Sequence, residues 1–200
     1  DVERSRGLGD VYKRQASDES IEALIKQVDE QWGELDFLVH SLAYADTQDL
    51  SKPFSETLRD GFNKAMEISA YSLLPLAKGV IPMMRKRGGG SIVSMSFIGS
   101  TLAVPNYNVM GPAKAALESC TRYLARELGP ENIRINSLSP GAIRTLSSAG
   151  IKDISEMIRV AGEHSAMKRT ATQAEVANTA AFLLSDAASG ITGQLIYVDC

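Results

Sequence analysis

The chain has few residues of the kinds that form metal and redox sites. Its 200 residues include two cysteines, two histidines and one tryptophan. Cys120 and Cys200 lie far apart in the sequence, and so do His40 and His164, so neither type shows the spacing of a zinc or dithiol motif. We therefore expect no metal site. Because the cysteine usage does not suggest an oxidising compartment, we expect a cytoplasmic protein.

Long apolar runs and an excess of charge of one sign are also missing. Hydrophobic residues make up 44% of the chain, charged residues 22%, and the net charge is −3. No apolar run approaches the roughly 20 residues that a membrane-spanning helix needs, and no signal-peptide pattern opens the sequence. The small net charge offers no electrostatic basis for binding nucleic acid. We expect one globular domain with neither a membrane nor a nucleic-acid partner.

Segments with helical and strand patterns alternate along the chain. Apolar periodicity predicts helices over residues 17–32, 57–87 (as two helices), 107–128, 151–166 and 172–184. Short apolar runs predict buried strands over residues 35–40, 91–96, 134–139 and 195–199. Ser17 is a candidate N-cap, and Thr172 with Glu175 predicts a capping box. The alternation predicts an α/β fold with a Rossmann-like, doubly wound parallel sheet in three layers, α/β/α.

A tyrosine and a lysine stand seven residues apart at the start of the predicted helix over residues 107–128. Seven residues are close to two helical turns, so Tyr107 and Lys114 are expected on one face. A nearby ammonium favours the phenolate and would lower the tyrosine pKa from about 10. Such a pair can donate a proton or a hydrogen bond to a carbonyl oxygen that gains negative charge. Gly111, one turn after Tyr107, leaves room on that face for a bulky group.

The spacing alone does not establish this chemistry, because a half-buried tyrosine near a solvated lysine is an ordinary feature of helices. The preceding segment strengthens the catalytic interpretation. Residues 91–96 predict a buried strand, followed by a loop and then by the helix that carries the pair. This order is how an open α/β sheet presents a site at the carboxyl edge of its strands.

Four segments, in order, carry a family resemblance. They are Val39–Ala45; Pro105–Gly111 with Lys114; Ile143–Leu146 with Gly150–Asp153; and Gly193 with Val198–Asp199. The Tyr-x6-Lys pattern is typical of the short-chain dehydrogenase/reductase superfamily. The strings Asn-Tyr-Asn-Val-Met-Gly and Ile-Arg-Thr-Leu are far narrower. From about Ala16 to Asp199, the chain resembles the bacterial NADH-dependent enoyl-acyl-carrier-protein reductases of fatty-acid synthesis.

The resemblance implies reduction of the carbon–carbon double bond of a trans-2-enoyl thioester on acyl carrier protein. The implied cofactor is NADH, with NADPH not excluded, and the implied assembly is a homotetramer formed through helices at about 69–87 and 107–128. Tyr107 would bind the thioester carbonyl and stabilise the enolate, while Lys114 would hold the nicotinamide ribose and keep Tyr107 acidic. The residues implied at the cofactor are Leu42, Lys114, Ile143, Arg144, Thr145, Leu146 and Ser147. Those implied at the substrate are Ala45, Phe97 and Met110, beneath a lid that includes Ile154, Met157 and Ile158.

One departure from the family pattern concerns the second catalytic position. The enoyl reductases usually carry a second tyrosine where Phe97 stands, and phenylalanine cannot donate a hydrogen bond. The wider superfamily has a catalytic serine near this place, for which Ser94 and Ser96 are candidates. We favour Phe97 as the equivalent position. The alternative function is a short-chain dehydrogenase that acts on a ketone or an alcohol, such as a 3-oxoacyl thioester reductase.

The second departure is the lack of a glycine-rich dinucleotide loop. Gly7-Leu8-Gly9 has no third glycine at the right spacing and no apolar strand before it. Residues 1–15 are charged and patternless, which predicts a non-homologous or disordered leader. Residues 16–200 are expected to form a partial Rossmann-type reductase domain that lacks its N-terminal strands. Such a domain would expose a sheet edge and would aggregate or bind NADH poorly, so an inactive fragment is a further alternative.

Overall fold

The computed structural model describes residues 17–145, 148 and 151–200. Within these ranges four parallel strands form one sheet, and their order in space is their order in the sequence. The strands are β1 (Phe37–His40), β2 (Gly90–Met95), β3 (Ile133–Pro140) and β4 (Leu195–Val198). In the register of the sheet, Val39 pairs with Val93 and Val93 with Asn136. The predicted parallel sheet is confirmed.

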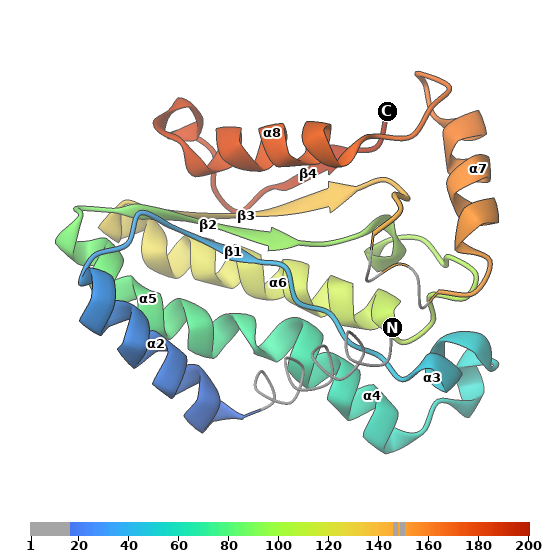
Figure 1. Cartoon of the computed structure of the whole chain (residues 1–200), viewed down its shortest axis with the longest axis horizontal. Helices are drawn as coiled ribbons and strands as arrows, with labels where there is room; N and C mark the ends of the chain where they lie inside the picture. The colour runs from blue at the N-terminus through green and yellow to red at the C-terminus, as the bar shows by residue number, and fades with distance from the viewer. Residues whose placement is uncertain (1–16, 146–147, 149–150) are drawn as a thin grey trace.

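Helices cover both faces of this sheet (Figure 1). One face carries α2 (Asp18–Trp32), α4 (Arg59–Met66), α5 (Leu73–Lys86) and α6 (Met110–Leu128), and the other carries α8 (Gln173–Leu184). The short helix α3 (Thr47–Ser51) and α7 (Ile154–His164) lie beyond the carboxyl ends of the strands. The short helical turns are η1 (Phe54–Glu56), η2 (Glu67–Tyr71), η3 (Ile98–Ser100), η4 (Gly129–Glu131) and η6 (Asp186–Ala188). The predicted three-layer α/β/α arrangement is confirmed.

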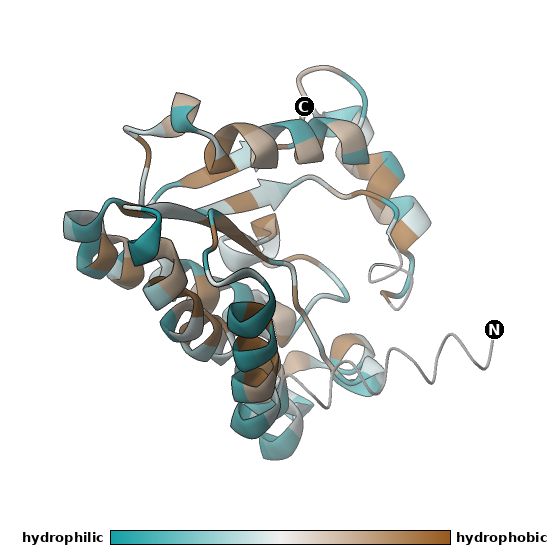
Figure 2. Ribbon diagram, turned by 60° about the vertical axis from the view of Figure 1, so that its left-hand side comes forward, coloured by the Kyte–Doolittle hydropathy of each residue, from teal (hydrophilic) through white to brown (hydrophobic). Residues whose placement is uncertain are grey.

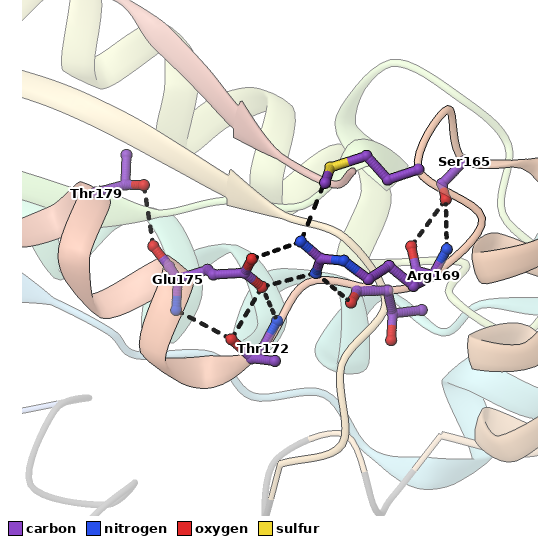
Figure 3. Close-up of polar contacts among 7 residues, drawn as sticks. Ser165, Arg169, Thr172, Glu175 and Thr179 are labelled. Atoms are coloured by element: carbon purple, nitrogen blue, oxygen red, sulfur yellow. Dashed lines mark hydrogen bonds and ion pairs between the residues drawn. The ribbon is translucent and has the colours of Figure 1, made fainter.

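Local sequence sets two of the helix boundaries, as predicted. The Ser17 side chain accepts a hydrogen bond from the backbone N–H of Ser20 at the start of α2. At α8, Thr172 and Glu175 form both bonds of a capping box, and the Arg169 guanidinium binds the Glu175 carboxylate (Figure 3). Arg169 and the Thr172 donors together hold the pKa of Glu175 at about 2. Both predicted caps are confirmed.

The main core lies between the sheet and the helices α5 and α6. Its largest fully buried side chains include Leu73, Met84, Ile92, Leu117 and Ile133. A second cluster fills the space beneath α8. Figure 2 shows hydrophobic residues along the strands, as expected for a sheet that is covered on both faces. No helix in the described ranges combines the length and the hydropathy that crossing a membrane requires.

One helical prediction needed correction. The helix predicted over residues 107–128 begins at Met110, so Tyr107 lies in the turn before it. The reason is the backbone of Asn106 and Asn108, whose φ angles of 60° and 34° do not fit a right-handed helix. The two helices predicted over residues 57–87 are confirmed as α4 and α5, which are joined by the π-helical turn Glu67–Tyr71.

The sheet has an open edge at β1. Among the described residues, β1 pairs with β2 alone. Two of its apolar side chains are therefore accessible, with Phe37 52% and Val39 43% exposed. This is the exposed edge that the sequence predicted.

Candidate active site

A cavity of about 400 Å³ opens at the carboxyl ends of β1, β2 and β3. Its lining comes from the segments that follow these strands, from the start of α6 and from α7. Among the lining residues are Leu42, Tyr44, Ala45, Leu50, Met95, Phe97, Tyr107, Met110, Lys114, Ile143, Thr145, Ile154 and Met157. The position is the one where open α/β sheets bind ligands. A mostly apolar lining with a few polar groups is typical of a small-molecule site.

Among the described residues, this cavity brings together the catalytic, cofactor and substrate residues that the sequence predicts, except for Arg144. The Arg144 side chain is exposed and donates to Ser155 Oγ at 2.8 Å. Arg144 lines a second, shallower hollow that it shares with Ile158, one of the predicted lid residues. The predicted cofactor residues Leu146 and Ser147 lie outside the described residues, as does the predicted leader over residues 1–15.

Tyr107 reaches the cavity from the turn before α6 and is only 7% exposed. Its ring lies against that of Phe97, with the ring centroids 4.7 Å apart and the planes inclined by 57°. This burial raises the pKa of Tyr107 well above its ordinary value. The prediction that Lys114 lowers this pKa is wrong for this structure, because taking a phenolate out of water dominates the shift. Tyr107 is therefore a neutral phenol, whose hydroxyl can donate a hydrogen bond.

Two glycines allow the backbone to approach this tyrosine closely. A Cβ atom at Gly99 would lie 2.4 Å from a carbon of the Tyr107 ring. A Cβ atom at Gly111 would lie 2.8 Å from the carbonyl oxygen of Gly99. The room that Gly111 was expected to leave for a bulky group is thus taken by the chain's own backbone.

Lys114 lies on α6 and is 5% exposed. Its Nζ donates to the carbonyl oxygen of Met95 at 2.7 Å. Burial lowers the pKa of Lys114 to about 8, and the charge of Glu118, one turn further along α6, opposes this shift. Glu118 is itself buried and accepts a hydrogen bond from the Ser96 hydroxyl. Lys114 and Glu118, one turn apart on α6, therefore bind the successive residues Met95 and Ser96 at the end of β2. These contacts fix Lys114 at the cavity.

The three candidates for the second catalytic position occupy different surroundings. Phe97 lines the cavity beside Tyr107. Ser94 is buried, and its hydroxyl bonds to those of Thr121 and Ser137 at 3.1 and 2.8 Å. Ser96 reaches the cavity lining, but its hydroxyl is bound to Glu118. The geometry therefore favours Phe97 over either serine as the neighbour of Tyr107.

His40 and Glu118 are polar groups of this region that the sequence interpretation missed. The Ser72 hydroxyl donates to the carbonyl oxygen of Ile68 at 2.7 Å, so at 2.8 Å it accepts from His40 Nε2. His40 Nδ1 is then an unprotonated acceptor, buried and without a hydrogen-bond partner in the described part of the chain. Burial, together with the charge of Lys114, lowers the pKa of His40 to about 4. No local pattern predicts the contact, because its partners lie 32 residues apart.

The cavity suits the nicotinamide end of a dinucleotide. Lys114 presents a buried ammonium, and since the Met95 carbonyl takes one of its three donors, the others are available to ligand hydroxyls. Leu42 and Ile143 line the same cavity with apolar side chains.

Comparison with known proteins supports this picture. A protein-family model described as enoyl-(acyl carrier protein) reductase matches residues 10–200. The chain is 52% identical over 182 residues to enoyl-acyl-carrier-protein reductase (NADH) FabI of Synechocystis sp., an alignment that covers 91% of this chain and 70% of the relative.

Two solved structures share the fold. The enoyl-acyl-carrier-protein reductase of Anaplasma phagocytophilum in complex with NAD is 40% identical, with a TM-score of 0.88, covering 93% of this chain and 70% of that one. The Bacillus cereus enoyl-acyl carrier protein reductase with NADP+ and indole naphthyridinone is 42% identical, with a TM-score of 0.89, covering 92% of this chain and 71% of that one. Because the family model spans nearly the whole sequence and a relative is more than half identical, this chain belongs to the enoyl-acyl-carrier-protein reductases of the short-chain dehydrogenase/reductase superfamily.

Proposed function

We propose that this reductase saturates the carbon–carbon double bond of a trans-2-enoyl thioester carried by acyl carrier protein, with Tyr107 and Lys114 as its catalytic residues. One observation carries the assignment of residues. The buried phenol of Tyr107 and the buried ammonium of Lys114 open into one cavity, whose other walls are largely apolar. A thioester carbonyl and an unsaturated acyl chain need such a combination of donor and apolar surface.

Tyr107 acts on the thioester carbonyl oxygen. Addition of hydride to the β-carbon of an enoyl thioester moves negative charge onto that oxygen, giving an enolate. A neutral phenol donates a hydrogen bond that strengthens as the charge develops, which lowers the barrier. Because Phe97 has no donor, Tyr107 supplies this contact without an aromatic hydroxyl partner at position 97.

Lys114 and the neighbouring backbone hold the cofactor. NADH supplies the hydride when bound, and NADPH is an alternative because one similar structure contains NADP+. Lys114 binds the nicotinamide ribose hydroxyls through the donors that Met95 leaves free. Leu42, Ile143 and Thr145 form the adjoining wall, while the remaining lining contacts the acyl group: Ala45, Phe97 and Met110, with Ile154 and Met157 of α7 covering it.

Oligomer and location also belong to the proposal. Tyr71, Leu74 and Tyr123, on the turn η2 and on α5 and α6, are 49%, 36% and 77% exposed. Exposed apolar side chains on these helices support the homotetramer that the family resemblance implies. Light scattering of the purified protein should give the mass of four chains, and a monomer at assay concentration would contradict it. A cytoplasmic location remains a prediction from the sequence.

The assay that tests the function compares two thioesters. The protein expressed from the whole reading frame that encodes this chain is mixed with NADH or NADPH and with crotonyl or acetoacetyl thioester. We expect oxidation of the cofactor chiefly with the crotonyl compound. Preferential reduction of the acetoacetyl compound would refute the proposal in favour of a ketone reductase. Inactivity with both would favour an inactive protein.

A further inference from the structure

Two asparagines flank Tyr107, and both adopt a backbone conformation that helical residues do not. The φ angles of Asn106 and Asn108 are 60° and 34°. This left-handed region is tolerated by asparagine better than by most residues other than glycine. Tyr107 therefore enters the cavity from a turn whose shape depends on its two neighbours.

Asn108 also joins this turn to another wall of the cavity. Its Nδ2 donates to the carbonyl oxygens of Leu50 at 3.1 Å and of Lys52 at 2.7 Å. Carbonyl oxygens only accept, so the amide nitrogen of Asn108, and not its amide oxygen, faces them. Both amide hydrogens are used in this way. They bond to carbonyls at the end of α3, where the helix itself supplies no donors.

Leu50 connects these bonds to the phenol. Its side chain packs in the same buried cluster as Tyr107 and Met110, and it lines the cavity. Asn108 thus shapes the backbone beside Tyr107 and is bonded to the backbone of a residue in the same buried cluster as the tyrosine ring. The contact of Asn106 is weaker, because its Nδ2 lies 3.4 Å from the carbonyl oxygen of Lys152.

We propose that Asn108 is a positioning residue of the reduction, which sets the direction of the Tyr107 hydroxyl by tying the Tyr107 turn to the end of α3. Asn108 does not itself line the cavity and acts through Tyr107 and Leu50. The proposal rests on the proposed function, since the group that Tyr107 must reach is the thioester carbonyl. A displacement of about 1 Å at a reacting group can cost on the order of 100-fold in rate.

Asn132 provides a matched control. It too is an asparagine with a left-handed backbone, at φ 57°, and its Nδ2 donates to the carbonyl oxygen of Gly88 at 3.1 Å. It lies at the opposite end of the sheet, just before β3. Asn132→Gly therefore removes the same kind of bond from the same kind of turn without touching the cavity.

The test uses Asn108→Gly and Asn108→Asp. Glycine keeps the left-handed conformation and removes both hydrogen bonds. Aspartate keeps the size of the side chain but turns carboxylate oxygens toward two carbonyls. With NADH and crotonyl thioester, we expect kcat to fall by roughly tenfold to 100-fold in both variants. The Kd for NADH should stay within about twofold, because Lys114 keeps its bond to Met95.

A second measurement does not depend on activity. Ultraviolet titration counts the phenols that ionise near their ordinary pKa of about 10. Asn108→Gly should release one further phenol into this range, and adding Tyr107→Phe should remove it again. Asn132→Gly should match the wild type in both measurements.

The outcomes separate this proposal from the proposed function. The positioning role of Asn108 would be overturned if Asn108→Gly kept the wild-type kcat and an unchanged titration. It would also be overturned if Asn108→Gly lost kcat and NADH affinity equally, or if Asn132→Gly showed the same losses as Asn108→Gly. If Asn108→Gly does not fold, the kcat and Kd of Asn108→Asp decide in the same way. If the wild type reduces no enoyl thioester, the proposed function fails, and the titration alone still shows whether Asn108 holds Tyr107.

Discussion

Phe97 and Tyr107 lie side by side in the wall of one cavity, with ring centroids 4.7 Å apart and planes inclined by 57°. One ring ends in a hydroxyl and the other does not. Phe97 therefore supports the Tyr107 ring by packing, with no part in hydrogen bonding to a substrate. Of these two rings, only that of Tyr107 can donate a hydrogen bond to a substrate carbonyl.

Removing that hydroxyl should reduce the rate of the chemical step. We expect Tyr107→Phe to lower kcat with crotonyl thioester by about 100-fold or more, the cost of deleting a donor to a developing oxyanion. The Kd for NADH, measured by fluorescence titration, should stay within about twofold of the wild type because Lys114 is unaffected. Tyr123→Phe, on the exposed face of α6, is the control. A kcat within about threefold of the wild type would remove Tyr107 from the mechanism.

NADH affinity should depend on pH through Lys114. Its pKa of about 8 means that the ammonium predominates below that pH and the neutral amine above it. An ammonium is the stronger hydrogen-bond donor to ribose hydroxyls, so the Kd for NADH should rise as the pH increases from about 7 to about 9. Lys114→Met should bind weakly and without this dependence, whereas Lys78→Met, at an exposed site on α5, should keep it. A wild-type Kd that is constant across the range would refute the assignment.

The elements of this fold follow from short-range patterns, and the exceptions have identifiable causes. Ser17 and the Thr172 capping box mark helix starts because each cap is formed within four residues of sequence. The start of α6 was misplaced because periodicity cannot show that Asn108 takes a left-handed backbone. Tyr107 and Lys114 line one cavity beside the strand ends, as the order strand–loop–helix predicts.

The polar contacts that complete the site lay beyond such patterns. His40 bonds to Ser72 across 32 residues, Ser96 to Glu118 across 22, and Asn108 to Leu50 across 58. No periodicity links partners so far apart. The direction of the Tyr107 pKa shift was missed for a related reason, since it depends on how completely the folded chain buries the ring.

Acid should destabilise the fold through His40. Its pKa is about 4 in the folded chain and 6.5 when exposed, so between these values the unfolded chain binds the extra proton. The free energy of unfolding should therefore be highest above about pH 6.5. It should decrease by on the order of 3 kcal/mol as the pH drops to about 4. Denaturant unfolding of His40→Gln, which keeps a donor for Ser72, should show a smaller fall. His164→Gln, at an exposed site, should match the wild type, and an equal slope in all three proteins would contradict the role of His40.

The open edge at β1 should make the 200-residue chain prone to association. Its accessible N–H and C=O groups and the exposed Phe37 and Val39 side chains can pair with a second copy. A lysine on an edge strand opposes such pairing, so Val39→Lys should lower light scattering at equal concentration, whereas Phe182→Lys, at an exposed site on α8, should leave it unchanged. The 200-residue chain by itself, unlike the protein from the whole reading frame that the kinetic and NADH-affinity tests above use, should bind NADH poorly, because its sequence has no glycine-rich turn for the pyrophosphate. If the 200-residue chain stays monomeric and binds NADH tightly in a fluorescence titration, both predictions are wrong.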